Sequence, residues 1–175
     1  DGFELAFGTN HLGHFLLTEL LRERLIASAP SRVVTVASRA HFRASRVDLD
    51  AAKGRTRTAT GFPEYCESKL ANVMFSAELA RRLQGTGVTA YSLHPGVVAS
   101  DLWRPVPRLF QPLIKLFMVS NEEGARTQLH WATSPELASE TGLYYDSCRA
   151  RNPSRLGADV ELARELWRRS EEWVA

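Results

Sequence analysis

Two short runs of β-branched and apolar residues, separated by a long helical pattern, constrain the fold of this chain most strongly. Residues 32–38 and residues 88–93 are apolar on both faces, which is typical of parallel strands covered by helices on each side. Residues 64–83 between them have the apolar spacing of an amphipathic helix. A strand, a helix and a strand in this order predict an α/β fold with a mostly parallel sheet.

Further patterns extend this alternation to both ends of the chain. We expect helices over residues 3–26, 122–133 and 160–175, and a third, short strand over residues 142–145. Three strands make a thin sheet, and the first two should be buried on both faces. More sheet is therefore expected outside this chain.

The bulk properties bound the class of protein. The 175 residues are 44% hydrophobic with a net charge of +2, which is typical of one globular domain. No basic tract indicates nucleic acid, and no apolar run is long enough to span a bilayer. Only Cys66 and Cys148 occur, which favours a reducing compartment, so we expect a cytoplasmic protein. Because the chain begins at Asp1 in a helical pattern, we expect it to be the C-terminal part of a longer protein.

Several polar side chains should converge at one edge of the sheet. Tyr65 and Lys69 are four residues apart on one helix face, where the ammonium favours the phenolate form of the tyrosine. Ser38 ends the first predicted strand, and His94-Pro95-Gly96 ends the second. Ligands of parallel α/β sheets bind at the carboxyl ends of the strands. The sequence therefore predicts an acid–base site at this edge.

The order of these motifs resembles the C-terminal portion of the short-chain dehydrogenase/reductase family, in particular its retinol dehydrogenase-like members. The matching motifs, which fall in the family's order, are Asn10-His11-Leu12-Gly13-His14-Phe15, residues 32–38 followed by His41, Tyr65-Cys66-Glu67-Ser68-Lys69-Leu70-Ala71-Asn72, and His94-Pro95-Gly96-Val97-Val98. The resemblance implies the C-terminal part of a Rossmann-like doubly wound parallel sheet. Residues 1–175 would then be the catalytic portion of one NAD(P)-binding domain whose N-terminal, phosphate-binding portion is absent.

The resemblance also implies a role for each site residue. Tyr65 would be the general acid or base on the substrate oxygen, and Ser38 would hydrogen-bond and orient that oxygen. Lys69 would hold the nicotinamide ribose, and Asn10, where its helix bends, would anchor a water on a proton relay through Lys69. Hydride transfer to a carbonyl develops negative charge on oxygen, which such donors stabilise. The implied cofactor-binding residues are Tyr65, Lys69, Pro95, Gly96, Val98 and Ser100.

The chain departs from the family pattern in three places. Ser100 stands where the family usually has Thr, and Ala37 where a second Ser is common, but a hydroxyl remains in each region. The glycine-rich turn that seats the pyrophosphate is missing, and residues 85–90 only imitate it, because they precede a strand. The residue that separates NAD from NADP also lies in the missing part, and NADP is favoured by the resemblance alone. The chain by itself should bind cofactor poorly.

Residues 100–120 combine dense apolar content with three prolines, and three interpretations stay open. They could be a loop that covers core surface, or a lid that selects a lipophilic alcohol or carbonyl, which the position beside the cofactor loop favours. Contact with a membrane surface is the third interpretation, because basic residues stand among the apolar ones, and we favour it least.

Single motifs also have ordinary structural interpretations. Asn10 alone could be a helix cap. His11 and His14 have a spacing compatible with a metal, but no cysteine or carboxylate cluster joins them, so core or solvent roles are favoured. His41 could approach the substrate pocket or be a plain loop histidine. Glu64, beside Tyr65, is expected in solvent.

The leading hypothesis is an oxidoreductase that transfers a hydride between NAD(P)(H) and a carbonyl or alcohol, retinoid-like or another lipophilic aldehyde or ketone. One alternative is an extended-type nucleotide-sugar epimerase or dehydratase, against which the apolar segment 100–120 argues. The other is a non-catalytic binding module, against which the intact catalytic residues argue. The expected partner is the small-molecule substrate, without nucleic acid, and a homodimer is compatible with the resemblance.

Overall fold

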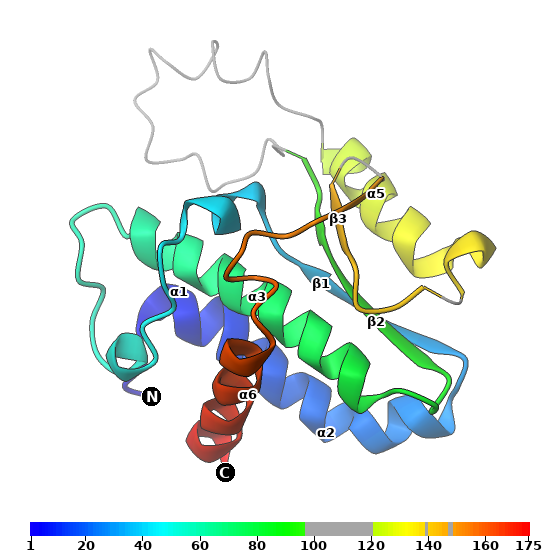
Figure 1. Ribbon diagram of the computed structural model, residues 1–175, viewed down its shortest axis with the longest axis horizontal. Helices are drawn as coiled ribbons and strands as arrows, with labels where there is room; N and C mark the ends of the chain where they lie inside the picture. Colours follow the sequence, from blue (N-terminus) through cyan, green and yellow to red (C-terminus); the bar gives the residue numbers. More distant parts are fainter. Residues whose placement is uncertain (97–120, 139, 147–148) are drawn as a thin grey trace.

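The computed structural model confirms the α/β architecture, with helices on both sides of one sheet (Figure 1). It describes residues 1–96, 121–138, 140–146 and 149–175. Within this part of the chain the sheet has the strand order β1-β2-β3-β4, with the first three parallel and β4 antiparallel to β3. The strands are β1 (Ser31–Val36), β2 (Val88–His94), β3 (Tyr144–Asp146) and β4 (Arg149–Arg151).

Both faces of the sheet are covered by helices. Successive strand residues point to opposite faces, so neighbouring residues belong to different cores. Val33 and Ala90 belong to the core shared with α2 (Gly13–Ala27), α3 (Phe62–Arg82) and α6 (Val160–Val174). Val34 and Tyr91 belong to the core on the other face, where Trp131 of α5 (Asn121–Thr133) packs. Figure 1 shows α2 and α3 along one side of the strands and α5 on the other.

The predicted strands differ from the observed ones in two respects. Strand β2 is buried along nearly all its length, as expected, but β1 is mostly half-buried, because it is the outer strand of the described sheet. Strand β1 is therefore less buried than predicted, although Val33 and Val34 pack against cores on opposite faces of the sheet. Strand β4 was not predicted, since its three exposed residues carry two charges and no apolar pattern.

The first helix contains an irregularity at the predicted bend. One helix was expected over residues 3–26, and the structure has α1 (Leu5–Phe7), a π-helical turn (Gly8–Leu12) and α2 in continuous succession. The π-turn contains Asn10. Such turns are rare and occur most often at functional sites.

Helix α3 is the central helix of the molecule. It begins after Gly61, whose φ of 66° is in the left-handed region that favours glycine, and Pro63 occupies its first turn. Glu64 is only 3% exposed, so its expected place in solvent is wrong. Its carboxylate accepts hydrogen bonds from the backbone of Arg57 and Thr58, which fixes the loop before the helix.

Shorter elements complete the described chain. Three 3₁₀ helices occur at Arg39–Arg43, Asp50–Ala52 and Pro135–Leu137. Among the helices that the structure describes, none has the combination of length and apolar character that crossing a membrane requires.

Candidate active site

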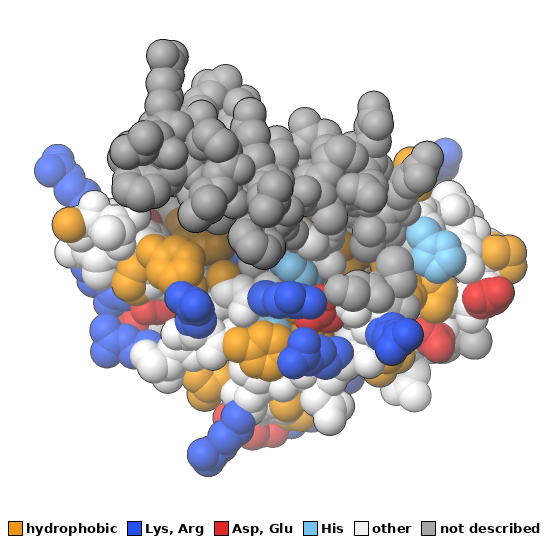
Figure 2. Space-filling model, turned by 90° about the horizontal axis from the view of Figure 1, so that it is seen from above, with side chains coloured by type: hydrophobic (Ala, Val, Ile, Leu, Met, Phe, Trp, Pro, Cys, Tyr) orange, Lys and Arg blue, Asp and Glu red, His pale blue; other side chains and the backbone are white. Residues whose placement is uncertain are grey.

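The predicted catalytic side chains come from three elements that meet where the parallel strands end. Ser38 follows β1 by two residues, Tyr65 and Lys69 lie on α3, and Asn10 lies in the π-turn. Figure 2 looks down on this end of the molecule and shows basic, acidic and hydrophobic side chains side by side.

Asn10 is connected to Tyr65 through one hydroxyl. The Asn10 Nδ2 group donates to Ser68 Oγ at 3.0 Å, and Ser68 Oγ donates to the backbone oxygen of Tyr65 at 2.8 Å. Ser68 is fully buried. The π-turn is thereby held in place against the first part of α3.

Lys69 is held by the end of strand β1. Its Nζ atom donates to the Val36 oxygen at 3.0 Å and lies 5.8 Å from the centre of the Tyr65 ring. The prediction that an ammonium stands beside the phenol is thus confirmed by the geometry. Burial lowers the pKa of Lys69.

Asn72, which has no predicted role, also belongs to this group. Its Nδ2 donates to the same Val36 oxygen at 3.3 Å, and its side chain is only 1% exposed. The available signal was its position three residues after Lys69, which places the two side chains on the same helix face. One carbonyl at the end of β1 therefore accepts from two side chains of α3.

Ser38 begins the 3₁₀ helix Arg39–Arg43 in an extended conformation, with φ −161° and ψ 155°. Its Oγ accepts from the backbone N–H of Ala40 at 3.2 Å, and its side chain is half-buried. The hydroxyl hydrogen can then be donated elsewhere, which fits a group that orients a substrate oxygen.

The cofactor loop is described only in its first part. Pro95 and Gly96 follow β2 directly, and Gly96 has a φ of 94°, a conformation that favours glycine. Val98, Ser100 and the segment 100–120 lie outside the described residues, so their predicted roles stay predictions.

An ionic cluster beside Ser38 was missed by the sequence reasoning. Arg39 binds Asp146 through two hydrogen bonds of 2.8 Å each, and Arg151 adds a third of 2.9 Å. Burial by itself raises the pKa of Asp146, but the hydrogen bond and charge of Arg39 outweigh it and lower that pKa overall. This cluster joins the loop after β1 to strands β3 and β4, and no spacing in the sequence indicates it.

The burial of the three histidines distinguishes their roles. His11 is buried and donates through Nε2 to Ser170 Oγ at 2.9 Å, because that hydroxyl already donates to Leu166, whereas His14 is exposed. No metal-binding group of three His, Cys, Asp or Glu residues exists among the described residues. His41 is fully buried in the 3₁₀ helix Arg39–Arg43, which follows Ser38.

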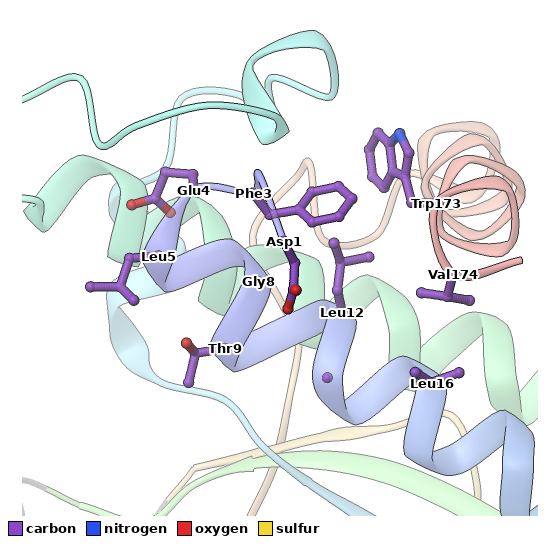
Figure 3. Close-up of a pocket in the computed structure, with 11 residues that line it drawn as sticks. Asp1, Phe3, Glu4, Leu5, Gly8, Thr9, Leu12, Leu16, Trp173 and Val174 are labelled. Carbon is purple, nitrogen blue, oxygen red and sulfur yellow. The ribbon is translucent and has the colours of Figure 1, made fainter.

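A hollow of about 530 Å³ lies beside the π-turn, between α1 and the end of α6 (Figure 3). Phe3, Leu12, Leu16 and Trp173 are among its lining residues. Its lining includes none of the four predicted catalytic side chains, so it is separate from the candidate active site.

Known proteins with similar sequences are consistent with this geometry. Human retinol dehydrogenase 12 is 47% identical over 173 residues, which cover 95% of this chain and 53% of that protein. Human retinol dehydrogenase 13 is 43% identical over an alignment of 182 positions, which covers 99% of this chain and 55% of that protein. The chain therefore spans about half the length of these curated relatives.

Solved structures show the same fold. An uncharacterized protein from Mycobacterium Paratuberculosis superposes with a TM-score of 0.73 at 32% identity, covering 96% of this chain and 57% of that one. The 3-ketoacyl-(acyl-carrier-protein) reductase from Brucella melitensis, complexed with NADH, reaches a TM-score of 0.60 at 18% identity, covering 80% of this chain and 53% of that one. This second likeness concerns the fold alone.

A family model described as short chain dehydrogenase matches residues 1–108, which include the π-turn, the Ser38 loop and the Tyr65 helix. With the relatives above, this match establishes that the chain belongs to the short-chain dehydrogenase/reductase family.

Proposed function

We propose that this chain is the catalytic portion of an oxidoreductase that transfers a hydride between a nicotinamide cofactor and a carbonyl or alcohol. The observation that carries the proposal is the arrangement of Tyr65, Lys69 and Ser38 at the carboxyl ends of β1 and β2, with Asn10 joined to the same helix. Residues 1–175 then form the C-terminal part of one NAD(P)-binding domain, and a preceding segment supplies the phosphate-binding turn.

The described residues fit a nicotinamide nucleotide. Lysine has three N–H donors, and the Val36 oxygen accepts one at 3.0 Å, so the ammonium is held in a fixed position from which it can also bind ribose hydroxyls. Gly96, at the end of β2, allows a close approach of the backbone. The bound cofactor supplies or accepts the hydride.

Side chains of the protein transfer the proton and stabilise the charge on the substrate oxygen. In the direction of carbonyl reduction, the Tyr65 hydroxyl gives its proton to the substrate oxygen as negative charge develops there. Ser38 donates a hydrogen bond to the same oxygen and orients it. Lys69, next to the Tyr65 ring, stabilises the resulting phenolate. Asn10 anchors a water, and this water returns a proton to Tyr65 by way of Lys69.

The substrate is a lipophilic aldehyde, ketone or the corresponding alcohol, of the retinal and retinol type. The similarity to retinol dehydrogenases 12 and 13 along nearly the whole chain supports this class. We propose NADP as the cofactor, on the basis of the family resemblance. A retinoid panel run with both cofactors tests the two choices.

The central test is Tyr65→Phe in the full-length protein that contains this chain. The loss of the acid–base group should lower kcat by about 10² to 10⁴-fold, a typical contribution of general acid–base catalysis, while cofactor binding is retained. Steady-state kinetics and fluorescence titration with NADPH measure the two quantities, and a thermal melt verifies folding. Turnover near the wild-type rate would refute the proposed mechanism.

A further inference from the structure

The buried imidazole of His41 connects the Ser38 loop to a distant segment of the chain. Its Nδ1 atom lies 2.6 Å from the backbone carbonyl oxygen of Ser38, and its Nε2 atom accepts from the backbone N–H of Ser154 at 3.2 Å. His41 has no exposed surface. The two contacts join residues that are more than a hundred positions apart in sequence.

These two partners determine the protonation state of the ring. A backbone N–H can only donate, so Nε2 must present its lone pair to Ser154. A backbone carbonyl can only accept, so Nδ1 must carry the hydrogen that faces Ser38. Only the neutral Nδ1–H tautomer satisfies both, and a protonated ring would place two N–H groups against each other.

The far end of the link is rigid. Ser154 belongs to a turn in which Gly157 donates to Ser154 Oγ at 3.2 Å and Ala158 donates to the Ser154 oxygen at 3.0 Å. A Cβ atom on Gly157 would come within 3.2 Å of Val73 on α3, so this turn packs tightly on the catalytic helix. Through its two ring contacts, His41 thus connects the backbone of Ser38 to a turn that packs on α3.

The surroundings of the ring are aromatic and ionic. The rings of Phe42 and Tyr144 lie 4.0 and 4.7 Å from it, centre to centre. Burial lowers the pKa of His41, with Arg151 acting in the same direction, while the Ser38 hydrogen bond and the charge of Asp146 act against it. The further charged and titratable groups on this side are Arg39 and His94.

We propose that His41 is a positioning residue, whose imidazole, together with its own backbone N–H at 3.1 Å, holds the Ser38 carbonyl and thereby aims the Ser38 hydroxyl at the substrate oxygen. The carbonyl and the side chain share one Cα atom, so fixing the carbonyl also fixes the direction in which Cβ leaves the backbone. The inference rests on the proposed function of Ser38. It assigns the imidazole to the geometry of the serine and gives it no contact with the substrate.

Two substitutions separate the two hydrogen bonds of the ring in the full-length protein. In His41→Asn the amide nitrogen can occupy the place of Nδ1 and keep the bond to Ser38. In His41→Gln the amide oxygen can reach the place of Nε2 and keep only the bond to Ser154. His41→Phe removes both, and His130→Asn on α5, where the histidine is exposed, is the matched control.

The expected result is a split among these variants. His41→Gln and His41→Phe should lower kcat about 10-fold or more, as expected for a misplaced reacting group, with an unchanged Kd for NADPH. His41→Asn and His130→Asn should stay within about threefold of the wild type. Wild-type kcat in folded His41→Phe, or equal losses in the Asn and Gln variants, would overturn the proposal while leaving the oxidoreductase assignment intact.

A spectroscopic readout does not depend on turnover. Nitrogen-15 NMR of the imidazoles in the full-length protein, with His41 assigned through the His41→Asn variant, should show a neutral Nδ1–H tautomer from pH 8 to about 5.5, below the ordinary histidine pKa. An Nε2–H tautomer, or titration near the ordinary histidine pKa, would overturn the positioning role. If no nicotinamide cofactor supports turnover, the proposed function fails while the tautomer result still stands.

Discussion

At the scale of single residues, the site depends on how a few hydrogen bonds hold flexible side chains. A lysine has four rotatable side-chain bonds, and the Val36 oxygen removes much of that freedom by accepting from Lys69 Nζ. Asn72 donates to the same oxygen and so connects the end of β1 to α3 next to Lys69. The ammonium is therefore placed before any ligand arrives.

Lys69→Ala should weaken both binding and rate. Without the ammonium, the cofactor ribose and the Tyr65 phenolate lose a neighbouring positive charge, so the Kd for NADPH should rise about 10-fold and kcat should fall about 10²-fold. Fluorescence titration and steady-state kinetics of the full-length protein measure the two effects. Lys53→Ala, which removes an exposed lysine, is the control. Unchanged NADPH binding in Lys69→Ala would contradict the assigned role.

The sequence predicted those site residues whose spacing has a direct geometric meaning. Tyr65 and Lys69 share a helix face by their spacing, and Ser38 was placed by the end of a strand. Asp146 escaped prediction, because its partner Arg39 is 107 residues away and only the fold brings them together. Glu64 was misjudged, since charged residues next to a site are commonly solvated and nothing in the sequence indicates the loop that it holds.

At the scale of elements, the Ser38 loop is fixed by the strands beside it. The carboxylate of Asp146, at the end of β3, accepts from Arg39 in the loop and from Arg151 in β4. The side chain of Asp146 is 3% exposed, whereas those of both arginines are more than half exposed. Strand β4, which hydropathy does not reveal, is thus important because its Arg151 binds the Asp146 carboxylate.

Asp146→Asn should destabilise the protein at neutral pH. Hydrogen bonds to charged groups contribute about 1.5–3 kcal/mol each, so a loss of about 2 kcal/mol in the free energy of unfolding is expected at pH 7. Because the pKa of Asp146 is lowered on folding, its stabilisation is present above about pH 4 and is lost as the pH falls further. Urea unfolding at pH 7 and pH 3 should therefore show the two proteins converging.

Asp50→Asn is the matched control for that measurement. Asp50 pairs with Arg169 at 2.8 Å, but its side chain is 93% exposed, and exposed pairs contribute about 1 kcal/mol or less. Equal effects of the two substitutions at pH 7 would contradict a structural role for the Asp146 cluster.

At the scale of the whole molecule, the architecture was predictable and the irregularities were not. The alternating patterns gave the order of the long helices and of the three parallel strands, because burial imposes a period on long segments. The π-turn and β4 were not predictable by periodicity, since each is a local departure from the regular repeat. Segment bounds differ from the predictions by one or two residues at most ends, as helix ends generally do.

The buried histidines make the stability of the whole molecule sensitive to mild acid. Burial lowers the pKa of His11 from 6.5 to about 3, with a contribution from His14, and burial also lowers the pKa values of His41 and His94. A group whose pKa is lowered on folding binds protons more readily in the unfolded chain. Below pH 6.5 each such histidine therefore removes about 1.4 kcal/mol per pH unit, until its folded pKa is reached.

The free energy of unfolding should fall by about 1.6 kcal/mol between pH 6.5 and pH 5 from His11 alone. Urea unfolding at a series of pH values measures this slope. His11→Gln should be less stable than the wild type at pH 7 but show a shallower slope of stability against pH. A stability that is constant from pH 8 to pH 5 would show that His11 is not buried as a neutral ring.

The π-turn has a consequence for what changes of length this chain can accept. A π-turn contains one residue more than an α-helical turn, and each residue of an α-helix turns it by about 100°. Removing one residue from Gly8–Leu12 would yield a more regular helix, but Asn10 and the aromatic side chains that follow it could no longer both face inward. An insertion or a deletion here would therefore move Asn10 or the aromatic side chains out of place, so the length of this segment is itself part of the active site.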